Sequence, residues 1–295
     1  MSFSSDVKAE LARQCSKSRH CQLAELAGML ELEGVIEKEH LTLELKLASD
    51  NELLTQKFQM LIRQAFGFEV KQGLNERQSR EILQALHWNQ VMQEEIPLEK
   101  QRADGLLVQR ICCKRAFIRG AFMAAGSISD PNKSYHFEIV CHTMEQAMQL
   151  QQLMGSFDAD AKIVERKERF VLYLKEGSQI VDMLNVMEAY VALMQLENVR
   201  ILKEMRNSVN RKVNCETANI NKTVNAAVKQ LEDIRKIQSV IGFDDLPAPL
   251  AEMAQVRLEH PEATLKELGT FLDPPVGKSG VHHRLRKLAE MAENL

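Results

Sequence analysis

The sequence predicts an α+β protein in which a duplicated domain with pseudo-twofold symmetry is followed by an all-helical domain. Three features support this prediction. A glycine-containing helical segment occurs twice, the leucines between positions 41 and 47 alternate with polar residues, and two amphipathic segments near the C-terminus flank a pair of prolines. A chain of 295 residues, 45% hydrophobic and 27% charged, is long enough for two or three such domains with packed cores.

The first third of the chain alternates between helical and strand periodicity. Its clearest strand spans Leu41–Leu47, where leucine occupies every second position, as in a strand with one face on a core. Thr42, Glu44 and Lys46 then form the exposed face. Trp88, the single tryptophan, is expected to be buried. The other elements expected here are helices over Ser4–Gln14, Cys21–Glu33, Asn51–Ala65 and Arg77–Gln93, and a short strand over Phe68–Lys71.

A helical segment with two glycines six residues apart occurs twice. The first copy spans Leu23–Ile36 and the second Arg115–Ile128, so that Gly120 follows Gly28 by 92 residues. Because glycine inside a helix costs about 1 kcal/mol relative to alanine, the paired glycines predict close packing of the two helices across a pseudo-twofold axis. The second copy should be followed by a strand over Tyr135–Cys141, a helix over Met144–Gly155, strands over Ala161–Glu165 and Phe170–Leu174, and a helix from Ser178.

The duplication sets the expected domain boundaries. Residues 1–106 form the first half of the duplicated domain and residues 107–207 the second, each with the order helix, strands, helix, strands, helix. Residues 208–295 form a basic helical connector and an all-helical domain. The sequence leaves open whether the connector and the all-helical domain are one part of the protein or two.

Two short helices joined by a turn are expected between Thr264 and the C-terminus. Thr264 can cap the first helix, with Glu267 three residues later to complete a capping box. Pro274 and Pro275 stop that helix. After Gly277, the second helix should bury an apolar stripe at intervals of four, three and four residues, formed by Val281, Leu285, Leu288 and Ala292.

The second of these helices has the layout of a helix-turn-helix recognition helix. Ser279, His283 and Arg286 lie near the pole opposite the apolar stripe, whereas Arg284 flanks the stripe. The segment 278–287 contains four lysines or arginines and no carboxylate. The early turns of such a helix enter the major groove of DNA while its apolar stripe stays docked. The residues predicted to contact DNA here are Lys278, Ser279, His282, His283, Arg284, Arg286 and Lys287.

The predicted roles of these side chains differ. His283 and Arg286 should reach base edges, and Ser279 either joins them or caps the helix. Lys278 and Lys287 sit off the pole, where they should meet phosphates, and Arg284 either contacts DNA or pairs with a neighbouring helix. The alternative for the whole segment is an ordinary amphipathic helix with a solvated basic face.

Charge is unevenly distributed along the chain. The net charge is −3 overall, but residues 1–106 hold 13 basic against 17 acidic residues, and Arg200–Lys236 holds nine against four. Arg211, Lys212 and Lys222 of this basic segment are further candidates for DNA contact, interspersed with asparagines that can reach phosphates. The alternative is a solvated helical connector.

The composition also restricts where the protein acts. No run of about eighteen apolar residues is present, and the first residues, MSFSSDVKAEL, do not have the pattern of a signal peptide. We therefore expect a cytoplasmic, nucleoid-associated protein with no membrane partner. The six cysteines include no CxxC pair and no Cys/His cluster at zinc spacing, so we expect them to be reduced and mainly packing residues, with no metal site and no cofactor.

Several strings of the sequence carry a resemblance to a known family. In the C-terminal half these strings are NRKVNCETANINKTVNAAVKQL from Asn210, LPAPLAEMAQVRLEHPEATLKELG from Leu246 and KSGVHHRLRKL from Lys278. Together they resemble the WhiA family of bacterial transcription regulators, as does the opening MSFSSDVKAEL. The segment Leu26–Gly34, LAGMLELEG, looks like the LAGLIDADG motif of homing endonucleases, and Ile118–Gly126, IRGAFMAAG, looks like its second copy.

The resemblance implies a degenerate LAGLIDADG nuclease scaffold joined to a helix-turn-helix domain, acting on DNA in cell division or sporulation. A nuclease of this class places one carboxylate from each motif at the shared axis to hold divalent metals. The equivalent positions here are Glu33 and Ala125, so one half of the metal site is missing. Glu31 faces another direction, and Asp130 is expected to cap a turn.

A nuclease of this class binds DNA with the polar faces of its strands. In this chain, the equivalent strand faces are unsuited to binding DNA. The counterpart of the Leu41–Leu47 strand exposes His136, Glu138, Val140 and His142, which is not a basic surface. Because phosphate attraction dominates affinity for nucleic acid, a neutral or acidic sheet should bind DNA poorly. We expect this scaffold to serve contacts with other transcription or division proteins.

The sequence therefore predicts a sequence-specific regulator that binds double-stranded DNA and has no catalytic activity. Two alternatives remain open. One is a residual metal-dependent DNA endonuclease, and the other is a nucleoid or cell-division adaptor whose DNA binding is incidental.

Overall fold

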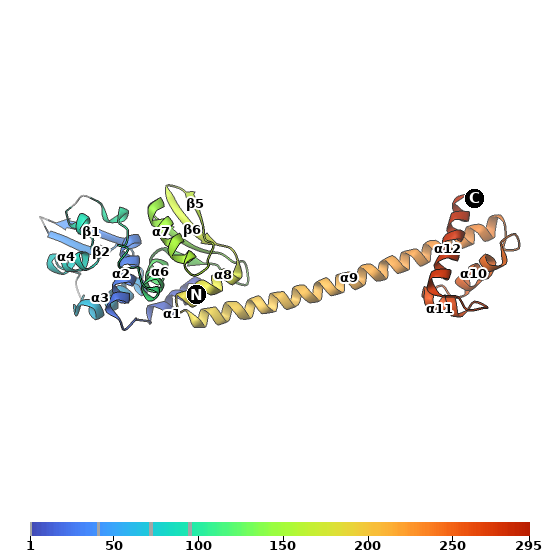
Figure 1. The fold of residues 1–295 in the computed structure, drawn as a ribbon, viewed down its shortest axis with the longest axis horizontal. Helices are drawn as coiled ribbons and strands as arrows, with labels where there is room; N and C mark the ends of the chain where they lie inside the picture. Colours follow the sequence, from blue (N-terminus) through green and yellow to red (C-terminus); the bar gives the residue numbers. More distant parts are fainter. Residues whose placement is uncertain (1, 40–41, 71–72, 94–95) are drawn as a thin grey trace. The chain divides into compact units, whose positions relative to one another are not determined.

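The computed structural model describes residues 2–39, 42–70, 73–93 and 96–295. The chain forms two compact units, Met1–Glu204 and Met205–Leu295. Within the described ranges, no helix combines the length and the apolar composition that crossing a membrane requires. The predicted fold class is confirmed, because the first unit mixes helices with sheets and the second is entirely helical (Figure 1).

The first unit is built around two long helices that lie against each other, α2 (Arg19–Glu33) and α6 (Ile111–Ala125). Nearly every residue of α2 from Cys21 onward is buried. A side chain at Gly28 would collide with the backbone of Phe117, and one at Gly120 would collide with the backbone of Glu25. Because Phe117 and Gly120 follow Glu25 and Gly28 by the same 92 residues, the two contacts are related by the predicted pseudo-twofold axis.

One sheet lies on each side of this helix pair (Figure 1). The first is a hairpin of β1 (Gly34–Glu39) and β2 (Thr42–Leu47), in which Leu43 and Leu45 are buried as predicted. Leu41 lies outside the described residues. The helices packed around this hairpin and the helix pair are α1 (Phe3–Ala12), α3 (Glu52–Phe66), α4 (Glu76–Ala85), α5 (Asn89–Met92) and a 3₁₀ turn, η1 (Leu98–Lys100).

The second sheet has four antiparallel strands in the order β3-β4-β6-β5. In β4 the residues alternate between buried and half-buried, with Phe137, Ile139 and Cys141 facing the core. The elements of this half are β3 (Gly126–Ile128), β4 (Phe137–Cys141), α7 (Met144–Gly155), β5 (Lys162–Arg166), β6 (Arg169–Leu174) and α8 (Gly177–Val186).

The two halves are less alike than predicted. The strand expected over Phe68–Lys71 is wrong for residues 68–70, which have no regular structure, and residue 71 lies outside the described range. The helix expected over Arg77–Gln93 is broken between α4 and α5, because His87 adopts a left-handed backbone conformation with φ 59°. Trp88 next to this break is fully buried, as predicted, and its indole N–H donates to the carbonyl oxygen of Arg102 at 3.0 Å.

Four helices form or enter the second unit. The long helix α9 (Tyr190–Val240) begins on the core of the first unit, where Ala192 and Leu196 are buried, and its last turns bring Ile234 and Ile237 into the core of the second. The other three are α10 (Ala248–Glu259), α11 (Leu265–Thr270) and α12 (Lys278–Glu293), which pack against one another around a small apolar core.

Candidate nucleic-acid interface

The turn between α11 and α12 is held by local features of the sequence. The predicted capping box is present: Thr264 N–H donates to a carboxylate oxygen of Glu267 at 2.8 Å, and Glu267 N–H donates to the Thr264 hydroxyl at 3.4 Å. The Thr264 N–H, and after it the Thr264 side chain, lower the pKa of Glu267 by hydrogen bonding to its carboxylate. Val276 N–H donates to the carbonyl oxygen of Gly269 at 2.9 Å, and a side chain at Gly269 would collide with the Val276 carbonyl. Glycine therefore lets the turn close.

The apolar stripe of α12 docks this helix on the rest of the unit. Val281, Leu285, Leu288 and Ala292 are all buried, as predicted, and α12 contacts both α10 and α11. The spacing of these residues leaves the opposite face of α12 in solvent. The geometry is that of a recognition helix held by its apolar side.

Six of the seven α12 candidates are exposed. They are Lys278, Ser279, His282, His283, Arg286 and Lys287. The suggestion that Ser279 caps the helix is wrong, because Gly277 occupies the N-cap position and Ser279 lies inside the first turn. Its hydroxyl is therefore presented on the same open face as His283 and Arg286.

Arg284 is the exception among the α12 candidates. Its side chain is half-buried, and its Nη1 lies 3.4 Å from a carboxylate oxygen of Glu252 on α10 and 3.4 Å from the carbonyl oxygen of Pro249. Of the two predicted roles, pairing with a neighbouring helix is thus confirmed. Arg284 fixes α12 to α10 instead of extending from the exposed face.

Arg286 has only a weak intramolecular partner. Its Nε lies 3.2 Å from a carboxylate oxygen of Glu290, one turn later, and 61% of the arginine side chain is exposed. Ion pairs this open contribute less than about 1 kcal/mol, so the guanidinium can leave Glu290 for a stronger acceptor. A guanidinium can bind two acceptors of a guanine at once.

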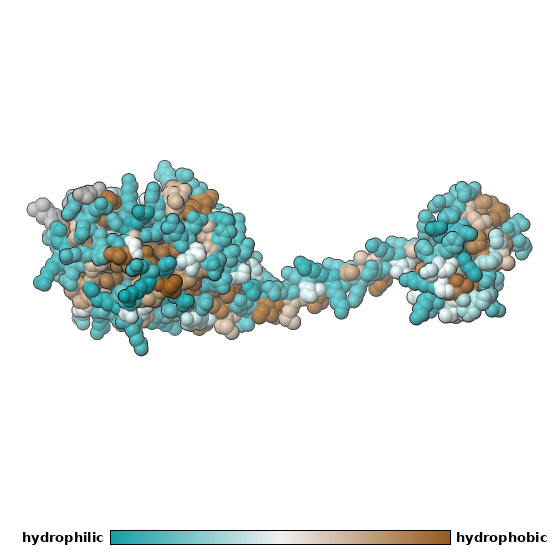
Figure 2. All heavy atoms as spheres, viewed as in Figure 1, coloured by the Kyte–Doolittle hydropathy of each residue, from teal (hydrophilic) through white to brown (hydrophobic). Residues whose placement is uncertain are grey.

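The candidates on α9 lie on an exposed part of that helix. Arg211, Lys212 and Lys222 are all exposed. Arg211 and Lys222 are eleven residues apart, a rotation of about 20° on an α-helix, so they share one face, whereas Lys212 is turned away by about 100°. Exposed apolar residues lie on the opposite face, among them Val213 and Ile220, and brown residues recur along this stretch in Figure 2. Arg211 and Lys222 can therefore approach one ligand together.

The motif positions of the first unit do not form a pair of metal-binding carboxylates. Glu33 ends α2 and Ala125 ends α6. Glu33 and Arg169 help to line a crevice of about 610 Å³. Burial raises the pKa of Glu33, against the effect of the nearby cations Lys8 and Arg169. These two cations offset the negative charge of the Glu33 carboxylate, which a bound metal ion would otherwise neutralise.

The other two acids near the motifs have structural roles. Glu31 is buried, and one of its carboxylate oxygens accepts the N–H of Ala103 at 2.8 Å. Burial raises the pKa of Glu31 to about 8, which keeps most of it protonated at neutral pH and unsuited to binding a divalent ion. Asp130 caps a turn, as predicted, by accepting the N–H and the side-chain amide of Asn132 at 2.9 and 3.0 Å.

The strand faces differ in charge. In the first sheet, Lys46 pairs with Glu37 and Glu44, so that face is not basic, whereas the side chain of Thr42 lies outside the described residues. In the second sheet, Glu138 holds His136 at 2.9 Å, with Val140 half-buried farther along β4 and His142 just past its end. On the neighbouring strands β5 and β6, Arg166 and Arg169 lie opposite each other in the strand register, so this part of the sheet carries two basic residues.

The structure also assembles a cluster that the sequence analysis missed. His20, Cys21, Cys112 and Cys113 place their ligand atoms within 4.8 Å of one another. Burial and the neighbouring thiols raise the pKa of Cys21 to about 12 and also raise the pKa of Cys113. Cys21 and Cys113 are buried in the core, in line with the expected packing role, but together with the exposed Cys112 they also lie beside His20. The available signal was the 92-residue spacing, which relates His20 to Cys112 and Cys21 to Cys113.

Comparisons with known proteins agree over the whole chain. The family model of the WhiA LAGLIDADG-like domain matches residues 114–206, and that of the WhiA C-terminal HTH domain matches residues 209–292. A relative named "Probable cell division protein WhiA" from Lachnoclostridium phytofermentans is 49% identical over 100% of this chain and 99% of its own length. The protein of the same name from Lachnospira eligens is 48% identical over 100% of this chain and 98% of its own.

One solved structure supports the same fold. It is the crystal structure of full-length WhiA from Thermatoga maritima, which matches with a TM-score of 0.58 at 22% sequence identity. The match covers 100% of this chain and 99% of the other.

Proposed function

The chain belongs to the WhiA family, and from this premise we propose that it is a sequence-specific DNA-binding regulator that reads double-stranded DNA with α12. Its relatives are named as probable cell division proteins, which supports a role in cell division, and the family resemblance implies a link to sporulation as the alternative. Such a regulator works on the nucleoid in the cytoplasm. Further transcription or division proteins would bind its first unit.

The observation that carries this proposal is the division of roles among the arginines of α12. Arg284 is held by Glu252 of α10, whereas Arg286 extends into solvent with only Glu290 near it. Helix docking and base contact therefore use different residues. Lys278 and Lys287 flank the same exposed face, at positions where a lysine can meet phosphates without reading sequence.

We also propose that the first unit has no catalytic activity. Ala125 stands where the second metal-binding acid of a LAGLIDADG nuclease belongs, and Glu33 faces Lys8 and Arg169. A single carboxylate offset by two cations is poorly suited to the two-metal clamp that phosphodiester hydrolysis uses. Incubation of the purified protein with plasmid and its best-bound duplex in Mg²⁺ or Mn²⁺ tests this point. Specific cleavage that disappears in Glu33→Ala would establish the endonuclease alternative instead.

Genome-wide crosslinking of the protein to DNA tests the regulatory role. A regulator gives a small number of sharp peaks at promoters, and these peaks should weaken in Arg286→Ala while the protein level stays the same. Broad coating of the chromosome, equal in both proteins, would favour the adaptor with incidental DNA binding. Absence of any enrichment would contradict both DNA-binding hypotheses.

A further inference from the structure

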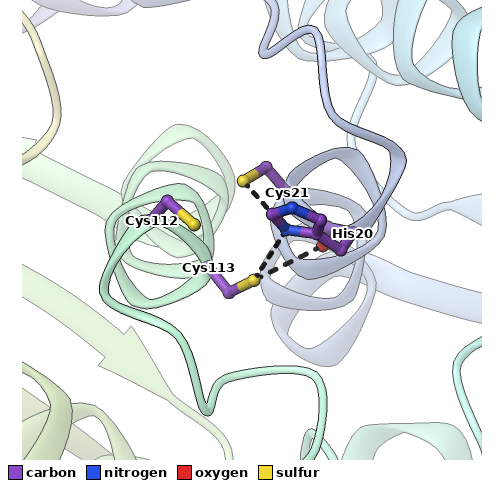
Figure 3. Close-up of side chains that lie close together, drawn as sticks. All are labelled: His20, Cys21, Cys112 and Cys113. Atoms are coloured by element: carbon purple, nitrogen blue, oxygen red, sulfur yellow. Dashed lines mark hydrogen bonds between the residues drawn. The ribbon is translucent and has the colours of Figure 1, made fainter.

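Four potential metal ligands meet where the two motif helices begin. His20 and Cys21 lie in the first turn of α2, and Cys112 and Cys113 lie in the first turn of α6. Figure 3 shows the imidazole and the three sulfur atoms gathered between the two helices. Among the residues that the structure describes, this is the one group of three or more His, Cys, Asp or Glu side chains arranged so that they could hold a metal ion.

The duplication of the domain explains how the four residues come together. His20 and Cys112 are 92 residues apart, as are Cys21 and Cys113, and as are Gly28 and Gly120 at the helix crossing. The pseudo-twofold axis that relates the glycines therefore also relates the two adjacent ligand pairs. Each half contributes two ligands, and the set is complete only when the halves are packed against each other.

The distances suit a tetrahedral ion. The Nδ1 atom of His20 lies 3.2 Å from the sulfur of Cys113 and 3.3 Å from the sulfur of Cys21, and all four ligand atoms lie within 4.8 Å of one another. With zinc bonds of about 2.3 Å to sulfur and about 2.0 Å to nitrogen, tetrahedral ligands lie roughly 3.5 to 3.8 Å apart. Side-chain movements of about 1 Å or less would therefore complete the coordination.

The chemistry of the four ligands selects the class of metal. Thiolates and imidazole bind zinc and disfavour magnesium and calcium, which prefer oxygen ligands. Three cysteines and one histidine form a closed set with no position left for substrate, as in structural zinc sites. Zinc with three thiolates carries one net negative charge, which the N-terminal ends of α2 and α6 and the nearby Arg110 partly offset.

Two of the four ligands are buried, and the other two leave a route by which a metal ion can enter from solvent. Cys21 and Cys113 are buried at 4% and 2% exposure, whereas Cys112 is exposed and His20 is half-buried. An ion can thus enter past Cys112 and be held by the buried sulfurs behind it. From this geometry we propose that His20, Cys21, Cys112 and Cys113 bind one zinc ion that joins the two halves of the first unit at the start of α2 and α6.

A metal titration of the full-length protein tests this inference. The protein is stripped with a chelator under reducing conditions and titrated with Co²⁺, which reports tetrahedral thiolate coordination in its visible and near-ultraviolet absorption; zinc should then displace cobalt. We expect saturation at about one ion per chain. Zinc bound at the site should also protect Cys112 from alkylation, measured by mass spectrometry, while leaving Cys215 reactive.

The matched variants are Cys112→Ser and Cys215→Ser. Both cysteines are exposed, so neither substitution disturbs the core, but Cys215 lies on α9 outside the cluster. Cys112→Ser should lower zinc affinity by about 100-fold or more, since loss of an outer-shell partner alone costs about 10- to 100-fold. Cys215→Ser should bind as the unchanged protein does. His20→Ala, with its circular dichroism unchanged, should lose the spectrum of the four-ligand site.

Three results would overturn the inference. The first is the lack of a saturable cobalt–thiolate spectrum in the reduced, folded protein. The second is an equal loss of zinc affinity in Cys112→Ser and Cys215→Ser. The third is a disulfide among the three clustered cysteines in metal-free protein isolated from cells under thiol-trapping conditions, because the cluster would then be a redox pair. None of these readouts depends on DNA binding.

Discussion

Arg119 of α6 binds both carboxylate oxygens of Glu25 on α2, with its Nε and Nη2 each at 2.9 Å. Lys57 of α3 lies 2.8 Å from the same carboxylate, and a second acid, Glu188, accepts from Nη1 of Arg119 at 2.9 Å. Glu25 and Lys57 have no exposed side-chain surface. Two acids and two cations thus balance in one network, with Glu188 at its partly exposed edge. The network joins the two motif helices to α3 and to the residues that precede α9.

Glu25→Gln should destabilise the first unit strongly. The substitution leaves Lys57 and Arg119 as buried cations without their shared acid, and breaking a buried pair in this way costs about 3 to 5 kcal/mol. The free energy of unfolding from denaturant titration measures the effect. Glu37→Gln is the control, because its ion pair with Lys46 is exposed and should contribute about 1 kcal/mol or less. Equal losses in the two variants would contradict the role given to the buried network.

Gly120→Ala tests the close approach of the motif helices. Alanine favours a helix by about 1 kcal/mol over glycine, but here its methyl group would collide with the backbone of Glu25. We expect a net loss of stability of about 2 kcal/mol or more. Gly155→Ala at the end of α7 is the control, since no heavy atom lies within 4 Å of the added carbon, and it should be neutral or stabilising. A stabilised Gly120→Ala protein would contradict the packing.

The free energy of unfolding should decrease as the pH rises, because of Glu31. Its pKa is about 8 in the folded state against 4.5 for an ordinary glutamate, so between these values the unfolded chain ionises while the folded protein stays protonated. The stability is fully present below about pH 4.5 and decreases by about 1.4 kcal/mol per pH unit up to about pH 8.

Glu31→Gln removes this titration and therefore checks it. Relative to the unchanged protein, the variant should gain a few kcal/mol between pH 5 and pH 8, measured by denaturant titration at each pH. A constant difference between Glu31→Gln and the unchanged protein over this range would show that Glu31 ionises in the folded state.

DNA affinity should reside in the second unit. A fragment of Met205–Leu295 contains α12 and most of the basic part of α9, so it should retain most of the affinity of the full chain, whereas Met1–Glu204 should retain little. Affinity is measured against salt concentration, and each lost phosphate contact should lower the slope of log affinity against log salt by about one. Tighter binding by the N-terminal fragment would contradict this assignment. It would indicate that DNA binds the sheets, where Arg166 and Arg169 lie opposite each other on β5 and β6.

Features that depend on local spacing could be predicted from the sequence. The apolar stripe of α12 and the Thr264 capping box follow from intervals of three and four residues, and both are present. The break at His87 could not be predicted in this way, because the buried Trp88 beside it is held by Arg102, fourteen residues later. Long-range packing here overrides the helical pattern.

The candidate sites also differ in whether they depend on local spacing or on long-range packing. The exposed face of α12 is a property of one helix, so its residues could be chosen from the sequence. The His20 cluster and the Glu25–Arg119 pair each join segments more than 90 residues apart, and the charge or thiol at one end gives no sign of the other. The 92-residue repeat relates His20 to Cys112 and Cys21 to Cys113, but it does not relate Glu25 to Arg119, which are 94 residues apart.

Substitution of Arg286 tests the central claim most directly. Binding of the full chain is measured to its preferred duplex, obtained by selection from random sequences, and to random DNA of the same length. Arg286→Ala should cost about 1 to 3 kcal/mol on the preferred duplex and much less on random DNA, whereas Lys287→Ala should weaken both similarly. An Arg286→Ala protein that is folded by circular dichroism and keeps its full preference for the selected duplex would contradict base recognition by α12.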